Sequence, residues 1–218
     1  KSAVTGIGWQ APLFNFLALS YKPNHIIAAF PNSQVLSFPL EDITVRSSEM
    51  LASVVFEPDT KLAIDRIQLM TLDLALDGAI GWHARADRLA LSTRQNASVE
   101  LAHDVVLDAI NVTPTKAFRT GLDPKGRLPA TIKTLLLDLK LGFNAPWDRI
   151  ALETGVPDVT TISVNNLNMA WGVLGLAAKG DLDVAPDGSV SGKLNLEVQN
   201  WREVLDLTVT SGLLDQFG

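Results

Sequence analysis

The feature that most constrains this chain is a regular alternation of leucine with polar residues over long stretches. Leucine or phenylalanine occupies every second position from Leu135 to Phe143. Side chains two residues apart lie on one face of a β-strand, so this segment predicts a strand with one apolar face. The same alternation recurs over 176–184 and 190–198, on either side of the turn sequence Ala185-Pro186-Asp187-Gly188. These two runs predict a long β-hairpin over residues 173–199.

Weaker alternation predicts further strands along most of the chain. We place them at 13–21, 25–30, 43–56, 61–77, 80–94, 99–112 and 159–171. The first two would be joined by a turn at Lys22-Pro23-Asn24. Most of the runs exceed the usual strand length of about 5–6 residues. Long strands indicate a mainly β fold with a strongly curved antiparallel sheet, either a half-barrel or a folded-over groove.

Few segments show helical periodicity. The clearest is the C-terminus, where Trp201, Val204, Leu205 and Val209 recur at the spacing of one helix face and Asn200 is a suitable N-cap. Shorter helices are expected at 146–154 and 114–121. No linker-like segment divides the chain, so residues 1–218 are expected to form a single domain.

Charge and composition exclude several function classes. The net charge of −6 disfavours nucleic acid and a strongly anionic membrane surface as direct partners. The absence of cysteine excludes disulfides, thiolate metal sites and cysteine nucleophiles. No apolar run approaches the roughly 20 residues that cross a bilayer. We therefore expect membrane association only through a segment absent from this chain.

Motifs that would indicate a reaction fail in their details. His25, His83 and His103 have no short metal-ligand spacing, and the calcium-loop pattern counted from Asp181 lacks its later ligands. The Gly6–Ala11 stretch matches a dinucleotide fingerprint only formally, because Pro12 follows at once. We expect no catalytic residues, no metal and no cofactor.

The 33 leucines are the strongest functional indication. Apolar faces on long strands need a cover, and with few helices that cover is a second sheet, closure of the same sheet, or a lipid-like ligand. The candidate groove residues are Trp82, Leu137, Leu139, Leu141, Trp171 and Trp201. The tryptophans have an alternative interpretation as core anchors at sheet ends and helix caps.

Several segments resemble a known family. They are Gly8–Pro12, Leu19–His25, Leu128–Ile132, Trp171–Leu182 and Gly188–Arg202. Together they resemble the bacterial domain of unknown function 2125, over nearly the whole chain. The last third is also similar to AsmA/TamB-type envelope proteins, whose long strands curl into an apolar groove for lipids.

The resemblance implies an uncharacterised periplasmic or cell-envelope protein, anchored in the inner membrane by sequence upstream of this chain. The chain would then be the C-terminal portion of a longer protein. Combined with the leucine pattern, it leads us to expect a non-enzymatic module that binds or conveys a lipid or another apolar ligand in a β-sheet groove. The alternative is a structural or assembly module that contacts other envelope proteins through a sheet edge.

Overall fold

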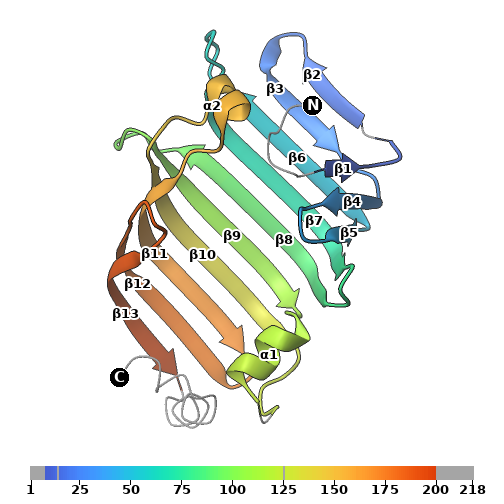
Figure 1. Cartoon of the computed structure of the whole chain (residues 1–218), viewed down its shortest axis with the longest axis vertical. Coiled ribbons are helices and arrows are strands. Elements are labelled where there is room, and N and C mark those ends of the chain that lie inside the picture. The colour runs from blue at the N-terminus through green and yellow to red at the C-terminus, as the bar shows by residue number, and fades with distance from the viewer. Residues whose placement is uncertain (1–7, 14, 125, 200–218) are drawn as a thin grey trace.

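A computed structural model describes residues 8–13, 15–124 and 126–199 of the chain, and its described part is one antiparallel sheet with two short helices (Figure 1). The strands are β1 (Gly8–Gln10), β2 (Asn15–Leu19), β3 (Lys22–Ala29), β4 (Ser33–Ser37), β5 (Asp42–Arg46), β6 (Glu49–Phe56), β7 (Ile64–Gly78), β8 (His83–Gln95), β9 (Ala102–Val112), β10 (Ile132–Phe143), β11 (Val159–Trp171), β12 (Leu174–Val184) and β13 (Val190–Gln199). The sheet does not close on itself. The predicted fold class, a mainly β chain with a long curved antiparallel sheet, is confirmed.

From β7 onward the sheet is a simple meander in which each strand pairs with its neighbours in sequence. The predicted hairpin over 173–199 is confirmed as β12 and β13, and the Gly188 amide donates to the Ala185 carbonyl at 2.9 Å across its turn. Neighbouring strands connected in this way form antiparallel pairs with few crossovers. The part of the chain with the longest and most regular alternation therefore folds with each strand next to its sequence neighbours.

The N-terminal part of the sheet divides into two arms at β7. The first half of β7 pairs with β6 and the second half with β5, so the segment predicted as one strand over 43–56 is interrupted at Ser47-Ser48. One arm continues through β3 to β2, and the other through β4 to β1. The sequence did not predict β1 or β4. The turn expected at Lys22-Pro23-Asn24 lies instead at Ser20-Tyr21, and those three residues open β3.

Two glycines let the last hairpin coil tightly. Gly180 and Gly192 have φ of 156° and 146°, and lie on facing strands of the hairpin. A Cβ on Gly180 would lie 2.0 Å from the Lys193 carbonyl oxygen, and one on Gly192 would lie 2.2 Å from that of Asp181. Only glycine permits this approach, because its backbone has no Cβ and adopts positive φ freely.

Both helices are single short segments capped by side chains. In α1 (Lys116–Leu122) the Thr115 side chain accepts from the Phe118 amide at 3.2 Å. In α2 (Arg149–Thr154) Asp148 accepts from the amides of Ile150 and Ala151 at 2.9 and 3.0 Å. They confirm the helices predicted at 114–121 and 146–154, with α2 beginning later than expected.

The predicted C-terminal helix lies outside the described residues. Neither described helix has the length and apolar character needed to cross a membrane.

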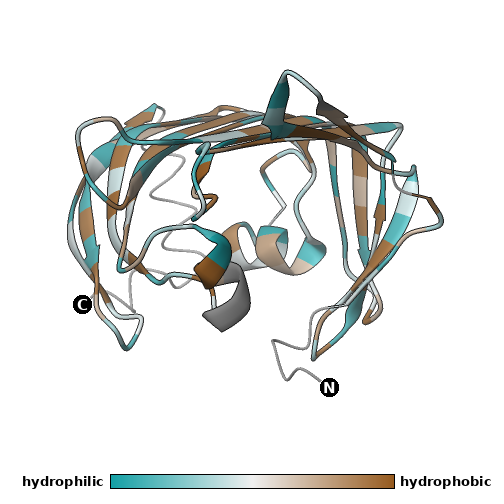
Figure 2. Ribbon diagram, turned by 90° about the horizontal axis from the view of Figure 1, so that it is seen from above, coloured by the Kyte–Doolittle hydropathy of each residue, from teal (hydrophilic) through white to brown (hydrophobic). Residues whose placement is uncertain are grey.

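The sheet bends into an open trough with the two helices on its concave side (Figure 2). Strand register assigns the faces. Leu91, Leu107, Leu137 and Leu167 are paired in one row across β8 to β11, on the concave face. On the convex face the equivalent row runs through Arg94, Asp104, Lys140 and Ser163. One apolar and one polar face are the expected result of period-two alternation.

The described residues form no second layer over the trough. Seven of the ten buried apolar side chains are alanines, and none is a leucine. The largest side chains less than 2% exposed are Trp171 and Thr71. In an ordinary domain the long aliphatic side chains fill the core. In this chain the described part leaves its leucines half-buried on an open surface.

Candidate apolar binding trough

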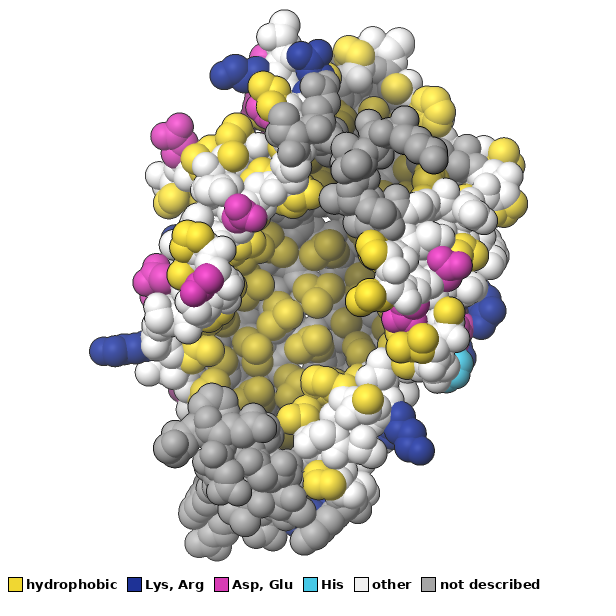
Figure 3. All heavy atoms as spheres, viewed as in Figure 1, with side chains coloured by type: hydrophobic (Ala, Val, Ile, Leu, Met, Phe, Trp, Pro, Cys, Tyr) yellow, Lys and Arg dark blue, Asp and Glu magenta, His cyan; other side chains and the backbone are white. Residues whose placement is uncertain are grey.

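The floor of the trough is a continuous apolar surface. In the space-filling view, hydrophobic side chains fill the hollow between the two raised walls (Figure 3). The leucine row of β8 to β11 continues to Leu69 on β7 in one direction and to Ala178 and Leu196 in the other. The apolar surface therefore extends from the middle of the sheet to edge strand β13, where Leu196 is 61% exposed.

Three of the predicted groove residues lie together on this floor. Leu137, Leu139 and Leu141 alternate along β10, and their partners on β9 are Leu107, Val105 and His103. All three leucines are half-buried. The partner residues were not predicted as site residues, although the alternation within each of their strands carries the same signal.

The predicted tryptophans lie away from the open floor. Trp82 occupies the turn between β7 and β8, where its indole N–H donates to a Glu41 carboxylate oxygen at 2.8 Å. Trp171 is only 2% exposed, beneath the α1 segment. Trp201 lies outside the described residues. For Trp82 and Trp171 the structure favours the alternative interpretation, that of anchors at the ends of the sheet.

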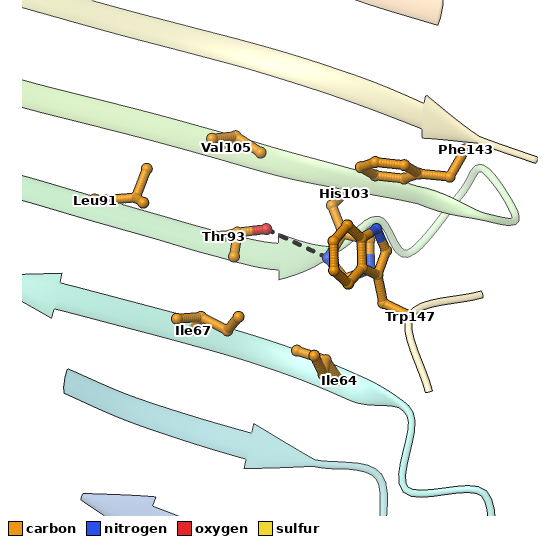
Figure 4. Close-up of a pocket in the computed structure, with 8 residues that line it drawn as sticks. All are labelled: Ile64, Ile67, Leu91, Thr93, His103, Val105, Phe143 and Trp147. Atoms are coloured by element: carbon orange, nitrogen blue, oxygen red, sulfur yellow. Dashed lines mark hydrogen bonds between the residues drawn. The ribbon is translucent and has the colours of Figure 1, made fainter. Parts of the chain in front are cut away.

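One end of the trough is closed by the segment that carries α2. Trp147 lies across the floor and contacts the Phe143 ring edge-on, with centroids 5.6 Å apart (Figure 4). Backbone hydrogen bonds hold the segment, from the Ile64 amide to the Trp147 carbonyl at 2.7 Å and from the Arg149 amide to the Lys61 carbonyl at 3.0 Å. Beneath Trp147 is a cavity of about 200 Å³ with an almost entirely apolar lining.

Besides Thr93, the polar residue that lines this cavity is His103. It is 8% exposed, its ring meets Phe143 edge-on at 5.9 Å, and its Nδ1 lies 3.3 Å from the Thr93 hydroxyl. Burial lowers the pKa of His103 below its ordinary value, while the charges of Asp104 and Asp65 oppose the shift. A neutral imidazole keeps this end of the trough apolar at neutral pH.

The opposite end is closed by α1 and the loop that follows it. The Phe118 ring stacks on Trp171 with centroids 6.4 Å apart and an interplanar angle of 17°. The Trp171 indole N–H donates to the Pro129 carbonyl at 2.7 Å. The trough is thus a cradle with two capped ends rather than an open channel.

The main cluster of charged groups lies on the turn end of β7 and β8. Asp77 binds the Arg46 guanidinium, accepts from His83 at 2.6 Å and has Arg85 at 3.8 Å. The hydrogen bond from His83 is the main cause of a lowered pKa of Asp77, and the two arginines act in the same direction. All three partners are more than half exposed, so the cluster has the character of a surface ion-pair network. Within the described ranges, no group of three or more His, Cys, Asp or Glu side chains is placed to hold a metal ion.

These observations define a class of protein, an open antiparallel half-barrel with an apolar inner face and capped ends. The sequence then identifies the family. A family model described as an uncharacterised protein conserved in bacteria, DUF2125, matches residues 1–217, and the chain belongs to that family. No curated protein and no solved structure matches the chain. The predicted family is therefore confirmed, and the similarity to AsmA/TamB-type proteins stays a hypothesis.

Proposed function

We propose that the chain binds an elongated apolar ligand, a lipid, along the floor of the trough as a non-enzymatic module of the bacterial cell envelope. The observation that carries the proposal is the row of half-buried leucines across β8 to β11, which no described element covers. Contiguous apolar surfaces of this kind on soluble proteins mark binding sites, because exposing them to water is unfavourable.

The dimensions of the floor suit a lipid. From Leu135 to Phe143 the strand advances eight residues, or about 26 Å at roughly 3.3 Å per residue. One leaflet of a bilayer core is about 15 Å thick, so a single acyl chain fits within this length. The floor carries few polar groups, and hydrogen-bonded recognition of a sugar or nucleotide has no basis there.

The capped ends favour binding over conduction. Trp147 at one end and the Phe118–Trp171 stack at the other limit the length of a bound chain. A ligand would enter from the side, through the open face of the trough (Figure 2).

Sheet-edge pairing remains the second candidate. In the described chain β13 pairs only with β12, and nine of its ten residues are exposed. Against it, the coiling at Gly180 and Gly192 twists this edge, and twisting is a common protection against strand addition. We therefore give precedence to the trough.

Organic extraction of the purified chain followed by lipid analysis, and titration with a fluorescent fatty acid, test the proposal. Leu137→Gln places an amide on the floor and is expected to weaken binding of the fatty acid at least tenfold. Leu136→Gln, the neighbouring residue on the convex face, is the matched control and is expected to leave binding unchanged. No extracted lipid together with no fatty-acid binding, or equal loss in the two variants, would refute the proposal.

A further inference from the structure

Positive charge is concentrated in one short part of the sequence. Residues 116–133 contain five of the 18 Lys and Arg residues and one of the 24 acidic residues, a net charge of +4. The remaining 13 basic and 23 acidic residues give −10. The overall charge of −6 therefore hides a basic segment.

The fold places this segment at one end of the trough. It consists of α1, the following loop and the start of β10, which lie together beside the β11–β12 turn (Figure 1). Lys116, Arg127 and Lys133 are exposed. The single acidic residue, Asp123, is only 5% exposed, and its carboxylate accepts from the Leu128 amide. We call the described residues 116–124 and 126–133, together with the turn residues 172–173, the basic end.

The other end of the trough has the opposite charge. The connections at 57–63, 96–101, 144–158 and 185–189 meet there, and they contain seven acidic residues and two basic ones. The molecule is therefore electrostatically polar along the trough. A polar molecule is oriented by a charged surface, since one end is attracted and the other repelled.

Apolar side chains stand among the basic groups. Phe118 is 51% exposed, although one face of its ring stacks on Trp171. Val173, in the β11–β12 turn, is 56% exposed. The turn adjoins the loop after α1, because a Cβ on Gly172 would lie 2.6 Å from Pro129 Cδ. Basic residues surrounding exposed apolar ones are the composition of surfaces that lie at a lipid headgroup layer.

We propose that the basic end docks on an anionic bilayer surface and directs the acidic end away from it. The expectation from net charge, that an anionic membrane is disfavoured, would then not apply to this end of the molecule. Near such a surface each Lys or Arg strengthens binding about fivefold. An acidic protein partner would match the charge as well, and the exposed Phe118 and Val173 among basic side chains favour the headgroup layer of a membrane.

Docking would place one end of the trough against the membrane, next to a source of lipid. This consequence rests on the proposed function, whereas the docking depends only on the charges and the two apolar side chains. The two proposals can therefore fail separately.

Co-sedimentation of the chain with vesicles tests the docking. One set of vesicles is pure phosphatidylcholine, and the other contains about one third phosphatidylglycerol. Binding to both sets is measured at low salt and at about 1 M salt, where the Debye length is only about 3 Å and charge attraction is screened. Binding is expected only to the anionic vesicles at low salt. The double variant Lys116→Gln with Lys133→Gln is expected to weaken it about 25-fold, at about fivefold per charge.

The matched control is Lys140→Gln with Lys179→Gln, which removes the same charge from β10 and β12 away from the basic end. It is expected to bind nearly as tightly as the unchanged chain. Each single lysine variant is also measured, which keeps the comparison valid if a double variant misfolds. The trough variant Leu137→Gln should dock normally, so that loss of ligand binding and loss of docking are distinguished.

Absence of binding to the anionic vesicles, equal binding to both vesicle types, or equal loss in the two double variants would overturn the proposal. Binding to polyglutamate without binding to anionic vesicles would also overturn it, and would indicate an acidic protein partner.

Discussion

Truncating a floor leucine should cost less stability than truncating an enclosed side chain of the same strand, although the leucine lies at the centre of the sheet. Leu139 lies on β10, the central strand of the floor, paired with Val105 and Val164. Leu139→Ala removes three carbons, worth about 0.8 kcal/mol each when fully buried. Because Leu139 is only partly exposed, roughly two thirds of that remains, and no cavity is enclosed where the side chain borders an open trough. We expect a loss of about 1.5 kcal/mol.

Ile132→Ala on the same strand is the matched control. Ile132 is 5% exposed and pairs with Val112 at the start of β10. Its truncation leaves an enclosed cavity and is expected to cost about 2–5 kcal/mol. Urea unfolding followed by tryptophan fluorescence gives both values, provided that the slope of the unfolding free energy against urea concentration is the same in the two variants and the unchanged chain.

If Leu139→Ala were as costly as Ile132→Ala, the floor would have to be covered in solution, and the reasoning from an open trough would be refuted. A loss of about 1.5 kcal/mol that grows when lipid is added would support it, because a ligand that binds only the folded chain adds its binding free energy to stability.

Three further expectations follow from the ends of the trough and its hairpin. Trp171→Ala should cost about 3–5 kcal/mol in urea unfolding, as for other buried aromatic side chains, and a near-neutral result would show that α1 does not anchor the sheet. Gly180→Ala should destabilise the protein far more than Gly188→Ala, since a Cβ at 180 would lie 2.0 Å from the Lys193 carbonyl oxygen whereas one at 188 meets open space. Equal urea midpoints of unfolding for the two variants would contradict the close approach at Gly180. Because the pKa of His103 is lowered in the folded chain, stability should fall as pH drops below the unfolded value of about 6.5 and level off below the folded pKa. The loss between neutral and mildly acidic pH should be smaller in His103→Gln, and an unchanged pH profile would exclude this group as its source.

The long strands could be predicted because alternation is a local property. From Leu135 to Phe143, and on both sides of the 185–188 turn, the alternation of apolar and polar residues shows which face of the sheet each position occupies. The division of the sheet at Ser47-Ser48 was not predictable in this way. It depends on two arms pairing with different halves of β7, which no local pattern encodes.

Only the middle of the candidate trough could be predicted from the sequence. The face on which Leu137, Leu139 and Leu141 lie follows from period-two alternation, but the segments that cover the two ends of the trough do not. Trp171 shares the concave face with Met169, yet it is enclosed by the α1 segment, whose residues lie about 40 to 55 positions earlier. Trp82 is directed to Glu41 by the hairpin between β7 and β8, whose turn lies between Gly78 and His83. Contacts between distant segments decided both outcomes.

The arrangement of leucine and alanine explains why the trough does not simply collapse. Buried positions on the concave side are held by small residues such as Ala109 and Ala178, and the leucines stand between them. A sheet stabilised by such cross-strand contacts and by its hydrogen-bond ladder keeps its curvature without a second layer. The apolar surface that remains open is unfavourable in water and becomes favourable once a hydrophobic chain lies on it. Within the described residues, the sheet therefore has the contacts of a stable scaffold and an uncovered apolar face, which a bound lipid would cover.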